Sequence, residues 1–165
     1  MNNMYLVVSV DAAWGIGYKG QLLAKEKKDM QRFRELTLDK TIVYGWNTLK
    51  TFPECRPLPG RKNLILTPDE EVRVQGAEIL HSIDEVLEYV NSHPEEQVVV
   101  VGGASVYHQL LPYCTKAYVT KFDETLTADV FFEDLDASDE WRLAEKMGKI
   151  QGSSVTMTFC TYCRT

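Results

Sequence analysis

The sequence predicts an α/β fold in which residues 1–165 form a single domain around a mixed, mostly parallel central sheet with about four flanking helices. Short runs of apolar, β-branched residues alternate with segments of helical periodicity, as in parallel sheets whose strands are joined by helices. The last two predicted strands have no helical segment between them, so an antiparallel C-terminal edge strand is expected. The length of 165 residues suits one hydrophobic core.

The elements follow from local patterns. Apolar, β-branched runs bounded by turn residues predict strands at residues 4–10, 41–45, 63–67, 76–81, 98–101, 116–122, 129–132 and 155–163. Apolar residues at helical spacing predict helices at residues 27–37 and 46–52, from 83 to the His93-Pro94 pair, and from the Gly102-Gly103 pair to Pro112. A capping box at residues 82–85 begins the third of these helices.

The composition is that of an ordinary globular protein. Apolar residues make up 44% and charged residues 25% of the chain, and the formal net charge is −6 with dispersed basic residues. This charge pattern disfavours a nucleic-acid surface. The chain has no apolar run long enough for a bilayer, no basic signal region at its start and no apolar surface stripe. We therefore expect a cytoplasmic monomer without a membrane partner.

The most informative stretch is Gln97–Pro112, in which the valines of 98–101 are followed directly by Gly102 and Gly103. The valine run predicts a central strand buried on both faces. Glycines at its carboxyl end would let a ligand approach the backbone, and the N–H groups that begin the next helix favour a phosphate. A tight turn without a ligand explains the glycines equally well, so both alternatives stay open at this point.

A second glycine-rich segment, Gly15–Gly20, matches the G-x-G-x-x-G pattern of dinucleotide-binding turns. In that motif the strand leads straight into a helix whose N-terminus meets the pyrophosphate. Here residues 11–14 intervene before the glycines, and residues 21–24 continue as loop after them. We therefore reject the dinucleotide role and expect a mobile surface loop beside a ligand.

Asp29 is unusual because it lies on the same side of its predicted helix as Phe33 and Leu36. A carboxylate among apolar residues is costly unless it is paired or functional. The ordinary explanation is a cap on the first helical turn, which spacing alone favours. The alternative is a proton donor, or a partner for a cationic or amidine-like ligand group.

The other reactive residue types give weaker signals. Arg56 and Arg61, in a Pro-rich turn, are either solvated or able to clamp a carboxylate. Cys160 and Cys163 form a C-x-x-C within an alternating strand pattern, where positions three apart face opposite sides, so free structural thiols are expected. The histidines are scattered without metal-ligand spacing, so no metal site is predicted.

Several motifs occur in order along nearly the whole chain: Ile16-Gly17, Leu22, Asp29, Phe33, Thr37, Gly45, Thr48, Arg56–Arg61, Val101–Gly103 with Tyr107, and Tyr118–Thr120. Together they are highly specific, and the chain resembles the dihydrofolate reductase family in its short bacterial form. The resemblance implies reduction of 7,8-dihydrofolate to 5,6,7,8-tetrahydrofolate by hydride transfer from NADPH, with protonation at N5. It also implies binding of antifolates.

The resemblance implies roles for individual residues. Asp29 would hold the amino-pyrimidine edge of the pterin and promote protonation of N5, with Thr120 joined to it through water. The implied substrate-binding set contains Arg61, which would clamp the glutamate α-carboxylate, and Val7, Met30, Phe33, Phe52, Leu58 and Val101 at the ring system. The implied cofactor-binding set contains Ser9 and Ile16 at the nicotinamide, and Gly45, Trp46, Thr48, Thr67, Gly102, Gly103, Ala104, Ser105, Val106 and Tyr107 along the rest of NADPH. The Gly102–Gly103 peptide would be cis.

Three departures from the family pattern carry their own expectations. The pair at residues 23–24, Leu-Ala, replaces Pro-Trp, which is expected to loosen closure over the substrate. Trp46 stands where the family usually has a basic residue and Ser105 supplies no cation, which weakens the case for NADPH over NADH. The charged run Lys25–Lys28 is expected to lower the proton affinity of Asp29.

Two alternatives share the fold. One is a folate- or nucleotide-binding protein with little catalysis, motivated by the missing Pro-Trp and basic residue. The other is a reductase of a different heterocycle, such as a pyrimidine intermediate of riboflavin synthesis. The spacing of Asp29 and Phe33, together with Arg61, disfavours the second alternative because it suits a pterin with a glutamate tail.

Overall fold

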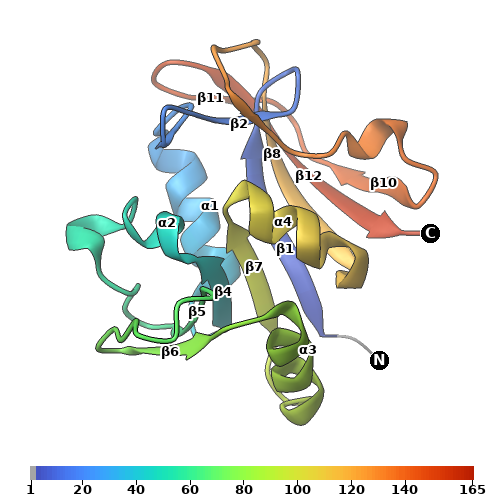
Figure 1. Cartoon of the computed structure of the whole chain (residues 1–165). Helices are drawn as coiled ribbons and strands as arrows, with labels where there is room; N and C mark the ends of the chain where they lie inside the picture. Colours follow the sequence, from blue (N-terminus) through green and yellow to red (C-terminus); the bar gives the residue numbers. More distant parts are fainter. Residues whose placement is uncertain (1–2) are drawn as a thin grey trace. The chain divides into compact units, whose positions relative to one another are not determined.

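The computed structural model describes residues 3–165, which divide into two compact units (Figure 1). The first unit contains the chain up to Leu6 together with Thr37–Cys114, and the second contains Val7–Leu36 and Thr115–Thr165. Strand β1 (Met4–Val10) begins in the first unit and ends in the second. Within the described residues, no helix is long and apolar enough to cross a membrane.

The first unit is built on parallel strands. Its helical elements are α2 (Trp46–Leu49), η1 (Pro53–Cys55), α3 (Ile83–Ser92), α4 (Ala104–Leu110) and η2 (Leu111–Tyr113), and its further strands are β4 (Thr41–Gly45), β5 (Lys62–Leu66), β6 (Ala77–Leu80) and β7 (Val98–Gly102). The strand order is β1-β7-β4-β5-β6, and every neighbouring pair is parallel. Val98, Val99 and Val100 in β7 are fully buried, which confirms the central strand predicted from the valine run.

The second unit is mainly antiparallel. Its elements are β2 (Gly15–Tyr18), β3 (Gln21–Leu22), α1 (Lys27–Thr37, whose last residue belongs to the first unit), β8 (Lys116–Phe122), β9 (Val130–Phe131), η3 (Leu135–Ala137), β10 (Trp141–Lys146), β11 (Ile150–Gln151) and β12 (Thr156–Arg164). Strand β12 pairs antiparallel with β8, as the sequence predicts. Strand β12 also pairs with the short β11 and with β10. Sequence patterns missed β10 because five of its six residues are exposed and show no apolar alternation.

The mixed α/β class and its four α-helices are confirmed, and the differences are local. Gly15–Gly20 contains no helix, which confirms that it is not a dinucleotide-binding turn. The prediction of a loop there was wrong, because Gly17 pairs with Leu22 and Val130 in a small three-stranded sheet. Helix α2 ends at Leu49 rather than 52, since Phe52 precedes a proline and is extended, with φ −81° and ψ 155°.

Candidate functional site

Asp29 lies in the first turn of α1 and is held by hydroxyl groups from two strands of the second unit. Ser9 on β1 donates its hydroxyl proton to Oδ2 of Asp29 across 2.6 Å, and the Thr120 hydroxyl on β8 also hydrogen-bonds this carboxylate. Burial raises the pKa of Asp29 above its ordinary value, the two hydroxyls oppose that rise, Glu26 adds to it and Arg32 reduces it. The result is a half-buried carboxyl group with increased proton affinity.

One expectation about the proton affinity of Asp29 changes. The lysine-rich segment before it was expected to lower its proton affinity, and this is wrong: the pKa is raised, and the residue of that segment whose charge acts on Asp29 is the acidic Glu26. The hydroxyl group of Ser9, a residue expected at the nicotinamide, donates its hydrogen bond to Asp29.

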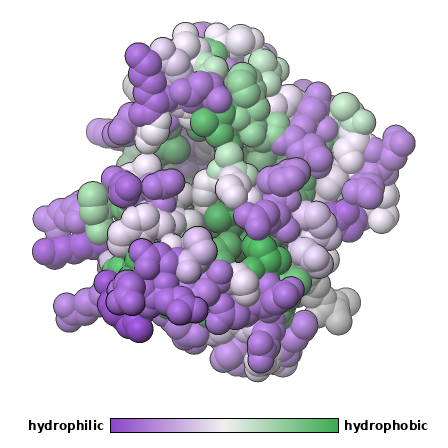
Figure 2. All heavy atoms as spheres, viewed as in Figure 1, coloured by the Kyte–Doolittle hydropathy of each residue, from purple (hydrophilic) through white to green (hydrophobic). Residues whose placement is uncertain are grey.

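Exposed apolar surface lies beside Asp29 on α1. Met30 is 59% exposed, Phe33 is half-buried, and Thr37 alone among the residues of α1 is fully buried. Val7 on β1 is buried. Hydrophilic residues cover most of the visible face of the protein, with smaller hydrophobic patches between them (Figure 2). Met30 and Phe33 therefore present apolar surface on the helix that carries Asp29.

The turn that leads to Ile16 is organised by a buried carboxylate that sequence patterns did not identify. Asp11 accepts hydrogen bonds from the N–H groups of Ala13, Gly15 and Leu126 at 2.8 to 2.9 Å. A Cβ at position 15 would stand 2.6 Å from Cβ of Ala128, so a side chain at this position would displace its neighbours. Half-buried Ile16 on β2 is therefore held by a rigid turn.

The segment before α1 is anchored by a second buried carboxylate, Glu26, which is 1% exposed. Its Oε1 accepts hydrogen bonds from N and Oγ of Ser153 at 2.7 and 3.1 Å, and its Oε2 accepts from N and Oγ of Ser154 at 2.8 and 2.6 Å. The hydroxyl of Ser154, its N–H and that of Ser153 lower the pKa of Glu26 from 4.5 to about 2, although burial opposes them. Glu26 is therefore a fixed anion at neutral pH.

Glu26 should stabilise the fold in a defined pH window. Because its pKa is lower in the folded protein, its contribution is complete above about pH 4.5 and is lost as the pH falls toward 2. We expect the stability difference between wild type and Glu26→Gln, measured by urea unfolding, to shrink from pH 5 to pH 2.5. The exposed Glu35 on the same helix gives the control Glu35→Gln, for which the difference should stay near zero throughout.

Ala24, in the pair that replaces Pro-Trp, takes part in the anchoring of the same segment. Its side chain packs against an apolar cluster of Phe122, Val155 and Met157. This contact and the hydrogen bonds that hold Glu26 restrain the segment on both sides of Lys25.

In the first unit, predicted cofactor residues meet at the carboxyl ends of β7 and β4. The Gly102–Gly103 peptide is cis, and Gly102 has φ +136°. A Cβ on Gly102 would stand 3.3 Å from Oγ1 of Thr48 and 3.6 Å from the hydroxyl of Tyr107. A Cβ on Gly45 would stand 3.1 Å from the Val106 side chain. This edge, which we call the glycine cradle, is where ligands bind in parallel α/β sheets.

The remaining predicted cofactor residues lie at or near the same edge but offer little positive charge. Thr67 follows β5, the neighbour of β4, and its buried hydroxyl accepts a hydrogen bond from N of Asp69 at 3.3 Å. Trp46 begins α2 and is 36% exposed. The exposed Ser105 next to Ala104 receives a hydrogen bond from Gln109 of its own helix at 2.9 Å.

Arg61 is set in a Pro-rich turn that Asn63 holds in place. The Asn63 side chain hydrogen-bonds N and O of Leu58 at 3.1 and 3.0 Å and also O of Arg61 at 3.0 Å. The guanidinium of Arg61 donates from Nε to Oγ1 of Thr37 at 3.1 Å and from Nη1 to O of Pro59 at 2.8 Å. Arg61 is thus a half-buried, oriented cation rather than a freely solvated one. Sequence patterns missed Asn63.

Two other predicted substrate residues lie near this turn or at the edge of the sheet. Phe52 is half-buried and packs edge-to-face on Tyr44, with ring centroids 4.8 Å apart. The Tyr44 hydroxyl donates to Oδ1 of Asn63 at 2.8 Å, which connects the aromatic pair to the turn that carries Leu58. Val101 is buried in β7, one residue before the glycine cradle.

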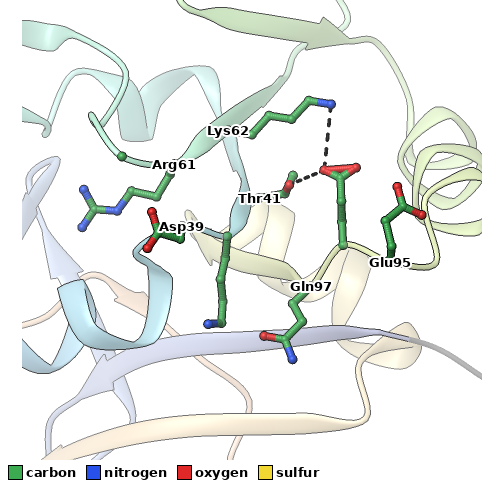
Figure 3. Close-up of a pocket in the computed structure, with 9 residues that line it drawn as sticks. Asp39, Thr41, Arg61, Lys62, Glu95 and Gln97 are labelled. Carbon is green, nitrogen blue, oxygen red and sulfur yellow. Dashed lines mark hydrogen bonds and ion pairs between the residues drawn. The ribbon is translucent and has the colours of Figure 1, made fainter.

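A pocket of about 700 Å³ opens at the amino ends of β4, β5 and β7, the edge opposite the glycine cradle (Figure 3). Its lining contains Arg61, whose side chain extends away from Thr41 and Lys62. Glu96 accepts hydrogen bonds from Thr41 at 2.5 Å and from Tyr89 at 2.8 Å, and these lower its pKa although burial opposes them. Because these groups already satisfy each other, we interpret the pocket as structural.

The chain is similar to known proteins over most of its length, in both sequence and structure. Residues 3–164 match the family model described as dihydrofolate reductase. The chain is 31% identical to the dihydrofolate reductase of Neisseria gonorrhoeae over 82% of each chain, and 33% identical to that of Bacillus subtilis over 83% of this chain and 79% of the relative. A solved structure of dihydrofolate reductase from Enterococcus faecalis, complexed with NADP(H) and RAB-propyl, aligns with a TM-score of 0.88 at 29% identity, over 98% of this chain and 96% of that one. The chain belongs to the dihydrofolate reductase family.

Proposed function

We propose that Asp29 promotes the protonation step in the NADPH-dependent reduction of 7,8-dihydrofolate to 5,6,7,8-tetrahydrofolate, the reaction of the family to which this chain belongs. The observation that supports this role is a half-buried carboxyl group with raised pKa, oriented by Ser9 and Thr120. A raised proton affinity is the direction that a proton-donating group requires. A helix cap alone would not require hydroxyl groups from two separate strands.

The pterin ring presents an amino group beside ring nitrogens, a donor pattern that one carboxylate can bind with both oxygens. Asp29 would hold this edge, while Val7 and Val101 would offer backbone carbonyls to the amino group. Met30 and Phe33 on α1 would pack on the ring system, as would Phe52 and Leu58. The low solvation of Asp29 strengthens each of these polar contacts.

The glycine cradle fits a dinucleotide cofactor. At Gly102 and Gly103 a Cβ would approach the Thr48 hydroxyl, so the absence of side chains there leaves backbone accessible to a ligand. NADPH, when bound, supplies the hydride that reaches C6 of the pterin. Thr48 and the N–H groups that follow Gly103 would bind its phosphates, and Ile16 and backbone atoms of Ser9 would orient the nicotinamide.

The direct test mixes the purified protein with NADPH and dihydrofolate and follows the loss of NADPH absorbance. Turnover above background is expected. Folded protein that binds an antifolate tightly without turnover would instead support the binding-protein alternative. Turnover with a pyrimidine substrate but not with dihydrofolate, in a parallel substrate panel, would support the other reductase.

Trp46 is expected to reduce discrimination between NADPH and NADH. The segment after Thr67 contains three acidic residues at positions 69–71, so the local charge there does not favour an extra phosphate. We expect Trp46→Arg to raise the ratio of kcat/KM for NADPH over NADH about fivefold to tenfold, as one partly exposed charge-assisted contact would. Trp46→Leu is the control, because it removes the ring without adding charge and should leave the ratio unchanged.

Dihydrofolate and antifolates are the small-molecule partners that this function requires. We propose a cytoplasmic monomer that binds neither nucleic acid nor membrane. The net charge of −6 and the dispersed basic residues support the absence of a nucleic-acid partner. Cys55, Cys114, Cys160 and Cys163 are all free thiols, which is typical of a reducing compartment.

A further inference from the structure

The clamped carboxylate of Glu26 stands directly before the helix that carries Asp29. The carbonyl oxygen of Glu26 accepts the N–H of Met30 at 2.9 Å, so Glu26 occupies the capping position of α1. Asp29 follows three residues later, within the same first turn. A displacement of Glu26 would therefore move the backbone that sets the position of Asp29.

The hydrogen bonds from Ser153 and Ser154, which we call the clamp, hold the Glu26 carboxylate closely against the turn between β11 and β12. A Cβ on Gly152 would stand 2.5 Å from Oε1 of Glu26 and 2.4 Å from O of Val155, so the turn admits no side chain at that position. Lys28 adds a second connection, because its Nζ donates to O of Gln151 at 3.0 Å. Lys28 in the first turn of α1 and Glu26 at its cap thus both bind the turn between β11 and β12.

The groups around Asp29 divide into charged and neutral ones. The charged groups with the largest effects on it are Glu26 and Arg32, both from α1 or its cap. Strands β1 and β8 contribute the hydroxyl groups of Ser9 and Thr120. The Arg32 guanidinium also lies over the ring of Phe159, 4.9 Å from its centroid. Among the charged groups with the largest effects on Asp29, Glu26 is the anion.

We propose that Glu26 is a positioning residue for Asp29, which fixes the first turn of α1 to the Gly152–Ser154 turn and keeps a permanent negative charge near the acid. This role rests on the function proposed for Asp29. It has two separable parts. The geometric part sets where the Asp29 carboxyl group lies, and the electrostatic part favours its protonated form, because a neighbouring anion opposes a second ionisation.

The first experiment compares the pH dependence of turnover in wild type and Glu26→Gln, with pre-steady-state measurement of hydride transfer. Glutamine keeps the size of the side chain and removes its charge. We expect the apparent pKa of the rate to fall by about half a unit to one unit, so that the rate at pH 8 drops about threefold to tenfold while the two enzymes converge in acid. Coincident profiles would overturn the electrostatic part.

Three further variants separate charge from structure. The double variant Ser153→Ala/Ser154→Ala weakens the clamp but leaves Glu26 ionised at neutral pH, so its profile should keep the wild-type apparent pKa. Glu35→Gln removes an exposed charge from the same helix and should behave as wild type. Glu26→Asp keeps the charge but is too short to reach both serines, so turnover should fall at an unchanged apparent pKa. Wild-type turnover in Glu26→Asp would overturn the geometric part, even if Glu26→Gln does not fold.

A carbon-13 NMR titration of the Asp29 carboxyl group supplies a readout that needs no turnover. The resonance should titrate at lower pH in Glu26→Gln than in wild type. If wild type does not reduce dihydrofolate but this shift is seen, the function proposed for Asp29 fails and the coupling to Glu26 stands. If wild type is active and the resonance titrates identically in both proteins, the coupling fails and the function stands.

Discussion

Replacing Asp29 with asparagine is expected to lower turnover of dihydrofolate at pH 7 by about two to three orders of magnitude, the size of a lost acid–base contribution. Asparagine has nearly the same shape, and its oxygen can still accept the hydrogen bond from Ser9. It has no titratable proton and cannot bind the pterin edge with two equivalent oxygens. NADPH binding, measured by fluorescence titration, should be unchanged. Wild-type turnover at neutral pH would remove Asp29 from the mechanism.

The same substitution should change the pH dependence of both rate and stability. Burial raises the pKa of Asp29 above 3.8, so the wild-type rate should decline as the pH rises through that raised pKa, while the residual rate of Asp29→Asn should be flat. The pH dependence of the stability contribution of Asp29 is opposite to that of Glu26. Because the pKa of Asp29 is raised in the folded protein, its contribution is complete below pH 3.8 and is lost as the pH rises above the folded pKa. Asp29→Asn should therefore melt at a higher temperature than wild type at pH 7. Glu35→Gln should change neither the rate nor the melting temperature.

The parts of the fold that the sequence predicted are those determined by short-range patterns. The run of valines at 98–101 can be satisfied only by a strand covered on both faces, and it became β7. Apolar spacing and a following turn located α1 at residues 27–37. A strand is recognised in a sequence when apolar residues mark its buried face. The antiparallel strand β10 was missed because only Trp141 of its residues is buried.

The parts of the site that the sequence did not predict depend on partners distant along the chain. Glu26, within a run of lysines, has the appearance of a surface residue, and its serine partners lie more than 120 positions away. Asp11 is a second case, because it accepts a hydrogen bond from the N–H group of Leu126, which is also distant along the chain. A single acidic side chain has no periodicity, so neither residue gives a local signal. The sequence does show which residue types lie on each face of a predicted helix. Asp29 was found in that way, because it is an acidic residue on the apolar face that contains Phe33 and Leu36.

Substitution of Arg61 by glutamine is expected to raise the KM for dihydrofolate about 30-fold to 100-fold with little change in kcat. The interaction at stake is a charge-assisted, bidentate contact with the glutamate α-carboxylate, worth about 2–3 kcal/mol. This contact is remote from the reacting atoms, so its loss weakens ground state and transition state alike. The two guanidinium hydrogen bonds to Thr37 and Pro59 orient Arg61 before substrate arrives, which reduces the entropy lost on binding.

The decisive comparison uses a dihydropterin that lacks the glutamate tail. Wild type and Arg61→Gln should reduce it with the same kcat/KM, because the tail is the group that Arg61 recognises. Arg56→Gln is the matched control, since Arg56 lies in the same turn, is exposed and pairs at 3.4 Å with Glu54, and it should have wild-type KM for dihydrofolate. If Arg61→Gln loses activity equally with both substrates, the residue stabilises the turn held by Asn63 rather than the substrate. The size of the effect on the tail-free substrate therefore measures how much of the role of Arg61 is structural.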